Sequence, residues 1–193
     1  VGVWLRAGAI DETAEEQGIA HLLEHMAFKG TTSRTAKEIA EEIENIGGYL
    51  NASTGYSRTG YYARVLRNDV GTALEILADI LTDPLFDAGE LDKERQVVIQ
   101  EIGEAADIPD DAVMDMLQRL SYGDNALGRP VLGTVESVTG HTRERLSAFM
   151  ANHYAPGELV ITASGGVDGD AVAKLAEGCF GARKAMSRPP RAL

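Results

Sequence analysis

The stretch His21-Leu22-Leu23-Glu24-His25 places three side chains suited to metal chemistry within five residues. On a helix, residues i, i+3 and i+4 share one face, so His21, Glu24 and His25 would point to one spot. Two imidazoles one turn apart can bind one zinc ion. Glu24, one residue before His25, is not placed to bind the same ion directly. It can instead hold a metal-bound water molecule and deprotonate it as a general base. The stretch therefore predicts a zinc site on a helix.

The competing interpretation is structural, because a histidine on an apolar helix face is more often a hydrogen-bonded core residue than a ligand. The chain has only four His, and two of them lie in this motif. Such a pattern seldom arises by chance in a chain of this composition. A purely structural zinc would need a fourth protein ligand and would leave Glu24 without a role. We therefore expect a catalytic zinc, which demands a third protein ligand and an open position for water.

The amino-acid composition indicates a globular domain and argues against nucleic-acid-binding and membrane-spanning proteins. The 193 residues, 44% hydrophobic and 25% charged, suit one domain with a sizeable core. The net charge of -12 argues against nucleic acid as a partner and favours neutral or basic ones. The single Cys179 forms no internal disulfide, which fits a reducing compartment. We expect no membrane span, because no apolar run reaches about eighteen residues.

The remaining pattern predicts alternating helices and strands. Thr35 and Glu38 form a capping box, Asp69 and Asp87 are expected helix caps, and Pro109 opens a helix. Expected helices span 19–28, 36–46, 70–81, 88–106, 109–122, 142–153 and 168–180, and expected strands span 1–6, 49–54, 59–65 and 158–164. A strand already under way at Val1 suggests a chain cut from something longer.

The long expected helix 88–106 offers candidates for the third ligand. Glu94 and Glu101 are seven residues apart, so they fall on nearly the same helical face. Their neighbours Val97 to Ile99 are apolar, which is unusual for purely solvated acids. Glu90, Glu94 and Glu104 could each be ordinary surface charges, so spacing alone does not identify the third zinc ligand.

These residues resemble a known family, the M16 zinc metallopeptidases, which include pitrilysin, insulin-degrading enzyme and the β subunit of mitochondrial processing peptidase. The motif at 21–25, followed by Glu101, is similar to the inverted zinc-binding signature of that family. The similarity covers nearly the whole chain. It extends through residues 26–31, 43–48, 51–52, 54, 61–62, 94–95, 98–102, 133–134 and 153–154.

The resemblance implies roles for five residues. His21, His25 and Glu101 would bind one zinc ion per chain, and Glu24 would activate water for peptide-bond hydrolysis. Glu94 would lie behind the ligands and orient one of them. The expected activity is that of a zinc-dependent endopeptidase acting on extended peptides or presequences.

The resemblance also implies substrate contacts, each with a plainer alternative. Asn51 and Ala52 fall where the family's edge strand pairs with an extended substrate, although they also suit an ordinary strand. Phe28 would line the pocket for the residue after the cut, or belong to the core. Asp111 and Asp115 share a helix face and would receive a basic substrate side chain, or form a solvated acidic face.

The expected fold is α+β, a mostly antiparallel sheet with helices packed on one face and zinc held between the first helix and the long one. We also expect parallel pairing at one place in the sheet. Residues 1–186 would form the N-terminal zinc-binding domain, with its first strand truncated, and 187–193 a linker to a missing second lobe. That lobe would lie in the same chain or a partner subunit, so these residues alone are expected to be weakly active or inactive.

The main competing function is a noncatalytic interaction or substrate-binding subunit. Such members of the family typically lose ligands or the base, whereas all four key residues are present here. The resemblance to bacterial members favours the bacterial cytoplasm as the compartment, with the mitochondrial matrix as the alternative.

Overall fold

A computed structural model describes residues 1–181 of the chain. The expected linker at 187–193 and the last residues of the expected domain lie outside this part. The four strands are β1 (Gly2–Leu5), β2 (Tyr49–Thr54), β3 (Thr59–Arg64) and β4 (Leu159–Thr162). The helices are α1 (Ile19–Ala27), α2 (Ala36–Asn45), α3 (Val70–Thr82), α4 (Ala88–Asp107), α5 (Pro109–Tyr122), α6 (Val135–Gly140), α7 (Arg143–His153) and α8 (Gly169–Phe180).

The strands form one sheet in the order β2-β3-β1-β4, and all three pairs are antiparallel. The α+β prediction is confirmed, but the expectation of parallel pairing is wrong. A parallel neighbour of β1 would require a crossover that returns the chain to the end where β1 begins. Instead, the helices between β3 and β4 return the chain to the end of the sheet where β1 finishes. There Leu159 pairs with Leu5, and β4 runs antiparallel to β1.

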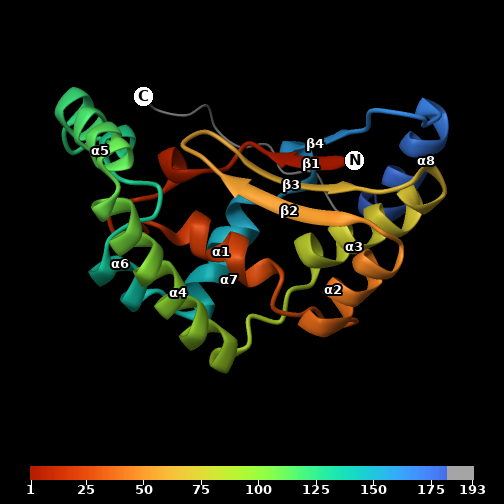
Figure 1. The fold of residues 1–193 in the computed structure, drawn as a ribbon, viewed down its shortest axis with the longest axis horizontal. Coiled ribbons are helices and arrows are strands. Elements are labelled where there is room, and N and C mark those ends of the chain that lie inside the picture. Colours follow the sequence, from red (N-terminus) through yellow and green to blue (C-terminus); the bar gives the residue numbers. More distant parts are fainter. Residues whose placement is uncertain (182–193) are drawn as a thin grey trace.

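The helices α1, α2, α3, α4 and α7 lie beneath one face of the sheet (Figure 1). The core forms between that face and the helices, with Val3 and Leu5 of β1 and Tyr61 of β3 fully buried in it. No helix among residues 1–181 is long and apolar enough to cross a membrane.

Helix α1 lies in the core because six of its nine residues are apolar and buried. They are Ile19, Ala20, Leu22, Leu23, Met26 and Ala27. The helical period leaves one narrow polar stripe, occupied by His21, Glu24 and His25. These three side chains are only partly buried. Burial of the apolar residues therefore fixes the direction in which the three polar residues point.

The predicted elements match those observed to within a few residues at each end. Side chains of Thr35, Asp87, Thr142 and Asp168 cap their helices as N-caps do, whereas Asp69 occupies the N-cap position of α3 without a capping hydrogen bond. Helix α6 was not predicted, because six residues are too few to show a helical period. Its only signal is the capping pair Thr134 and Ser137.

Replacing Gly18, the N-cap of α1, is expected to destabilise the fold. Its φ is 79°, and a Cβ added there would lie 2.5 Å from the carbonyl oxygen of Leu132. Gly18→Ala should lower the free energy of unfolding by about 2 kcal/mol or more. As the control, Gly103 lies inside α4 with nothing within 4 Å of its added Cβ, and Gly103→Ala should raise stability by about 0.5–1 kcal/mol. Urea unfolding measures both, and equal effects would contradict this account of Gly18.

Candidate metal centre

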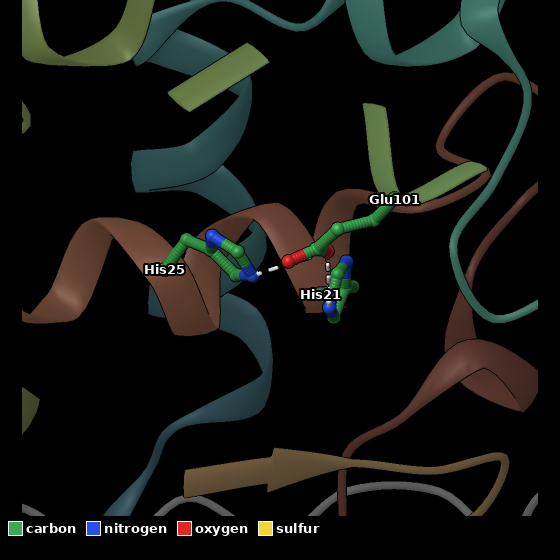
Figure 2. Close-up of side chains that lie close together, drawn as sticks. All are labelled: His21, His25 and Glu101. Atoms are coloured by element: carbon green, nitrogen blue, oxygen red, sulfur yellow. Dashed lines mark ion pairs between the residues drawn. The ribbon is translucent and has the colours of Figure 1, made fainter. Parts of the chain in front are cut away.

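The side chains of His21, His25 and Glu101 converge between α1 and α4. Glu101 Oε2 lies 3.6 Å from Nε2 of His21 and 3.6 Å from Nε2 of His25. One ligand atom from each of the three residues lies within 4.8 Å of the others. Figure 2 shows the carboxylate of Glu101 reaching toward both imidazole rings. Glu101, rather than Glu94, is therefore the acid whose carboxylate lies close to both histidines.

Glu94 lies behind this centre and holds His25. Its Oε2 is 3.0 Å from His25 Nδ1, and its Oε1 is 2.6 Å from Lys29 Nζ. Glu94 is buried, with a relative exposure of 5%. A buried carboxylate needs compensation, and here one oxygen meets the Lys29 ammonium and the other the imidazole. The contact occupies Nδ1 of His25 and leaves Nε2 directed at Glu101.

Glu24 points from α1 toward the sheet. The hydroxyl of Thr54, at the end of β2, donates a hydrogen bond to its Oε2. Burial raises the pKa of the Glu24 carboxyl, and the Thr54 hydrogen bond opposes that shift. A carboxyl whose pKa is raised is a better proton acceptor than an exposed one. Thr54 also restricts rotation of the side chain, so the carboxylate is held at the edge of the site.

The electrostatics of His21 favour a neutral imidazole. Burial, and after it the nearby charge of His25, lower the pKa of His21 to about 4. Its Nδ1 is buried without a hydrogen-bond partner among residues 1–181, and Nε2 faces Glu101. A neutral imidazole keeps a lone pair, which metal binding requires.

These residues fit zinc by the chemistry of their donors. Two imidazole nitrogens and one carboxylate oxygen form a known ligand set of catalytic zinc sites. Ligand atoms about 2.0–2.1 Å from a tetrahedral ion are roughly 3.3 Å apart, close to the two separations of 3.6 Å observed here. The side chains of His21, His25 and Glu101 keep 12%, 18% and 36% of their surface exposed, which leaves access to the centre.

A buried acid, Glu12, anchors the start of α1. Its two carboxylate oxygens accept hydrogen bonds from the N–H groups of Gly18 (3.0 Å) and Ala20 (2.9 Å). These N–H groups would otherwise lie unpaired at the helix N-terminus. Burial raises the pKa of Glu12 to about 8, against the lowering effect of the two hydrogen bonds. Glu12 therefore fixes the end of the helix from which His21 projects.

The predicted substrate residues lie on elements around the centre. Asn51 is exposed and Ala52 is buried on β2, which is an edge strand of the sheet. Phe28 is half-buried, one turn beyond His25, and its ring lies 6.1 Å from that of Tyr61. It packs partly against the core, as the plainer alternative held.

Asp111 and Asp115 are exposed on α5. Burial and the charge of Asp111 raise the pKa of Asp115. Tyr56, in the turn between β2 and β3, lies near Asp115 and forms a hydrogen bond with Gln118. Asp115 therefore lies near the turn that follows β2.

Sequence reasoning missed the roles of Lys29, Thr54 and Glu12. Lys29 follows His25 by four residues, so helical spacing was a usable signal for its placement on the same side. Thr54 had no such signal, because it reaches Glu24 from a different element. Glu12 is one of several acids in its segment, and nothing in the sequence distinguishes the one that becomes buried.

Comparisons with known proteins show the family and the fold of the chain. The sequence pattern of Insulinase (Peptidase family M16) matches residues 1–135. An uncharacterized zinc protease of Rickettsia felis is 45% identical over 179 residues, which are 93% of this chain and 43% of that protein. The chain thus spans less than half the length of this relative.

Two solved structures have a similar fold. The crystal structure of a protease from Helicobacter pylori matches with a TM-score of 0.91 at 24% identity, over 100% of this chain and 47% of that one. A peptidase M16 inactive domain from Pseudomonas fluorescens matches with a TM-score of 0.86 at 20% identity, over 97% of this chain and 46% of that one.

The pH dependence of stability tests the account of Glu12. Its pKa is raised from 4.5 to about 8 in the folded chain, so between these values the folded state binds a proton that the unfolded state releases. Stability contributed by this group is present at low pH and is lost as pH rises from about 5 to 8. Urea unfolding at several pH values should show a steeper loss in the parent than in Glu12→Gln. Identical slopes would contradict the assignment.

Proposed function

Because the chain belongs to the insulinase family, peptidase family M16, we propose that it acts as a zinc-dependent endopeptidase. The observation that carries the proposal is the convergence of His21, His25 and Glu101 beside Glu24. The relative from Rickettsia felis is named a zinc protease, which supports zinc as the metal. The relative also supports a bacterial source for the protein, and we propose the cytoplasm as its compartment.

In this proposal each polar residue has a separate task. His21, His25 and Glu101 would hold the zinc ion, which would supply Lewis acidity toward the peptide carbonyl and lower the pKa of water. Glu24 accepts a proton from the attacking water and passes it to the leaving amine. Thr54 holds the Glu24 carboxylate in place, and Glu94 keeps the His25 ring oriented through Nδ1.

The edge of β2 that pairs with no strand among residues 1–181 is our candidate for substrate capture. An edge strand presents backbone N–H and C=O groups that an added strand can pair with. Thr54 connects the end of β2 to Glu24, so a peptide paired along β2 would pass the base. Asn51 and Ala52 would contact its backbone, and Phe28 a side chain next to the cut.

A second lobe is part of the proposal. The chain covers 43% of the Rickettsia felis relative and 47% of the Helicobacter pylori protease. We propose that further residues, in the same chain or a partner subunit, enclose the substrate above the zinc site and help to stabilise the transition state. A domain at 1–186 followed by a linker is our proposed boundary.

The alternative function is that of a noncatalytic interaction subunit. It is favoured by one observation, the similar fold of the Pseudomonas fluorescens domain described as inactive. Fold similarity therefore does not distinguish the two functions. The presence of Glu24 beside the three converging residues supports the catalytic function, because hydrolysis requires these side chains and binding alone does not.

Zinc content and turnover test the catalytic proposal. The parent should hold one zinc per chain, Glu101→Gln should lose most of it, and Glu104→Gln should keep it, because Glu104 is an exposed acid on the same helix. In the longer protein, Glu24→Gln should keep zinc but lower the rate of peptide cleavage by about 10²–10⁴-fold. Elemental analysis and a fluorogenic peptide measure these effects. Zinc loss in both glutamine variants of α4, or full activity without Glu24, would contradict the proposal.

The acidic residues of α5 test the expected preference for basic substrates. Asp111→Asn combined with Asp115→Asn should weaken cleavage of peptides with an upstream Arg, by roughly two- to fivefold per carboxylate, and leave neutral peptides unaffected. Asp170→Asn combined with Glu177→Gln, which removes two exposed acids of α8, is the control for net charge. Equal loss on neutral peptides would assign these residues to an ordinary solvated face.

A further inference from the structure

A hollow of about 360 Å³ lies between α2 and the edge strand β2. Its apolar wall consists mainly of Phe28, Ile39, Ala40, Ile43, Tyr49 and Leu50. Glu44, an exposed residue of α2, adds one carboxylate to the lining. Ile39 and Ile43 are buried at the base of the hollow, whereas Ala40 and Tyr49 are exposed. The hollow is therefore an apolar pocket that opens at the surface.

The hollow is connected to the candidate metal centre in two ways. Phe28, which lines it, follows His25 by three residues at the end of α1. Leu50, Ala52 and Thr54 are the less exposed residues of β2, and they alternate with the exposed Tyr49, Asn51 and Ser53. Leu50 contacts the hollow and Thr54 bonds to Glu24. Both features thus lie on the same side of one edge strand.

We infer that this hollow is a specificity pocket for a large apolar side chain of the peptide substrate. The inference rests on the proposed peptidase function and on pairing of the substrate with β2. A paired strand directs every second side chain to the helix side of the sheet, where the hollow lies. Aliphatic and aromatic side chains match its wall, and the Glu44 carboxylate repels acidic ones.

Strand geometry gives the position of that side chain relative to the cut. Thr54 lies beside the general base, and Leu50 lies four residues earlier on β2, a distance of about 13 Å at roughly 3.3 Å per residue. An antiparallel partner matches the three pairs already in the sheet. Such a partner runs from Thr54 toward Leu50, so the pocket receives a residue about four positions after the scissile bond.

Peptide binding tests the pocket without requiring turnover. The probe is a short fluorescent peptide of Ser and Thr with one central Phe, compared with the same peptide carrying Ala, on a Glu24→Gln background. Burying the Phe ring should make binding about tenfold tighter or more. Ala40→Phe fills the hollow from an exposed position and should abolish the difference, whereas Ala173→Phe, on the exposed surface of α8, should preserve it. Equal affinity of the Phe and Ala peptides for the parent, or a difference that survives Ala40→Phe, would overturn the inference.

Cleavage by the longer protein separates this inference from the proposed function. Mass spectrometry should place the cut about four residues before the Phe in the parent, and the Ala40→Phe variant should lose that preference. A cut at an unrelated distance from the Phe overturns the pocket while supporting the peptidase. Selective binding with no cleavage at all supports the pocket and contradicts the peptidase.

Discussion

The structure depends on how helix α1 is held beneath the sheet. Six buried apolar residues fix its rotation, and Glu12 fixes its N-terminal end by accepting hydrogen bonds from Gly18 and Ala20. With rotation and position both set, the polar stripe of His21, Glu24 and His25 has one possible direction. The geometry of the candidate metal centre is therefore a consequence of core packing rather than of a flexible loop.

Helix α4 completes the arrangement because two acids seven residues apart lie on nearly the same face. Glu94 contacts Nδ1 of His25, and Glu101 lies near Nε2 of both histidines. The difference in burial separates their tasks. Glu94 is buried and neutralised by Lys29, while Glu101 remains partly exposed at the centre. One helix thus supplies both the candidate ligand and the group that orients its neighbour.

Edge strand β2 would set the direction in which a bound peptide runs past the candidate metal centre. Thr54 ties its end to Glu24, and Leu50 lines the hollow beside α2. A backbone captured along this strand would meet the base, then Phe28, then the hollow. In this account, selectivity comes from side chains on the helix side of the sheet, and the acids of α5 add a separate preference for charge.

Much of the fold was predictable because local signals agree with the tertiary structure. The apolar period of α1, the capping box of α2 and the β-branched and aromatic residues of β2 and β3 each correspond to an observed element. Strand direction was not predictable for β4, because it depends on where the intervening helices deliver the chain. Spacing alone could not tell which of Glu94 and Glu101 lies near both histidines, because that depends on how α1 packs against α4. Long-range partners such as Lys29 with Glu94 and Thr54 with Glu24 likewise required the fold.

The most direct measurement is an anomalous difference map at the zinc absorption edge, from crystals of the chain grown with zinc. We expect one strong peak about 2.0–2.2 Å from Nε2 of His21, Nε2 of His25 and a carboxylate oxygen of Glu101. Glu24 should lie near the peak without contacting it, and Glu94 should remain bonded to His25. A peak bound by Glu94 in place of Glu101, or no peak between α1 and α4, would contradict the central claim.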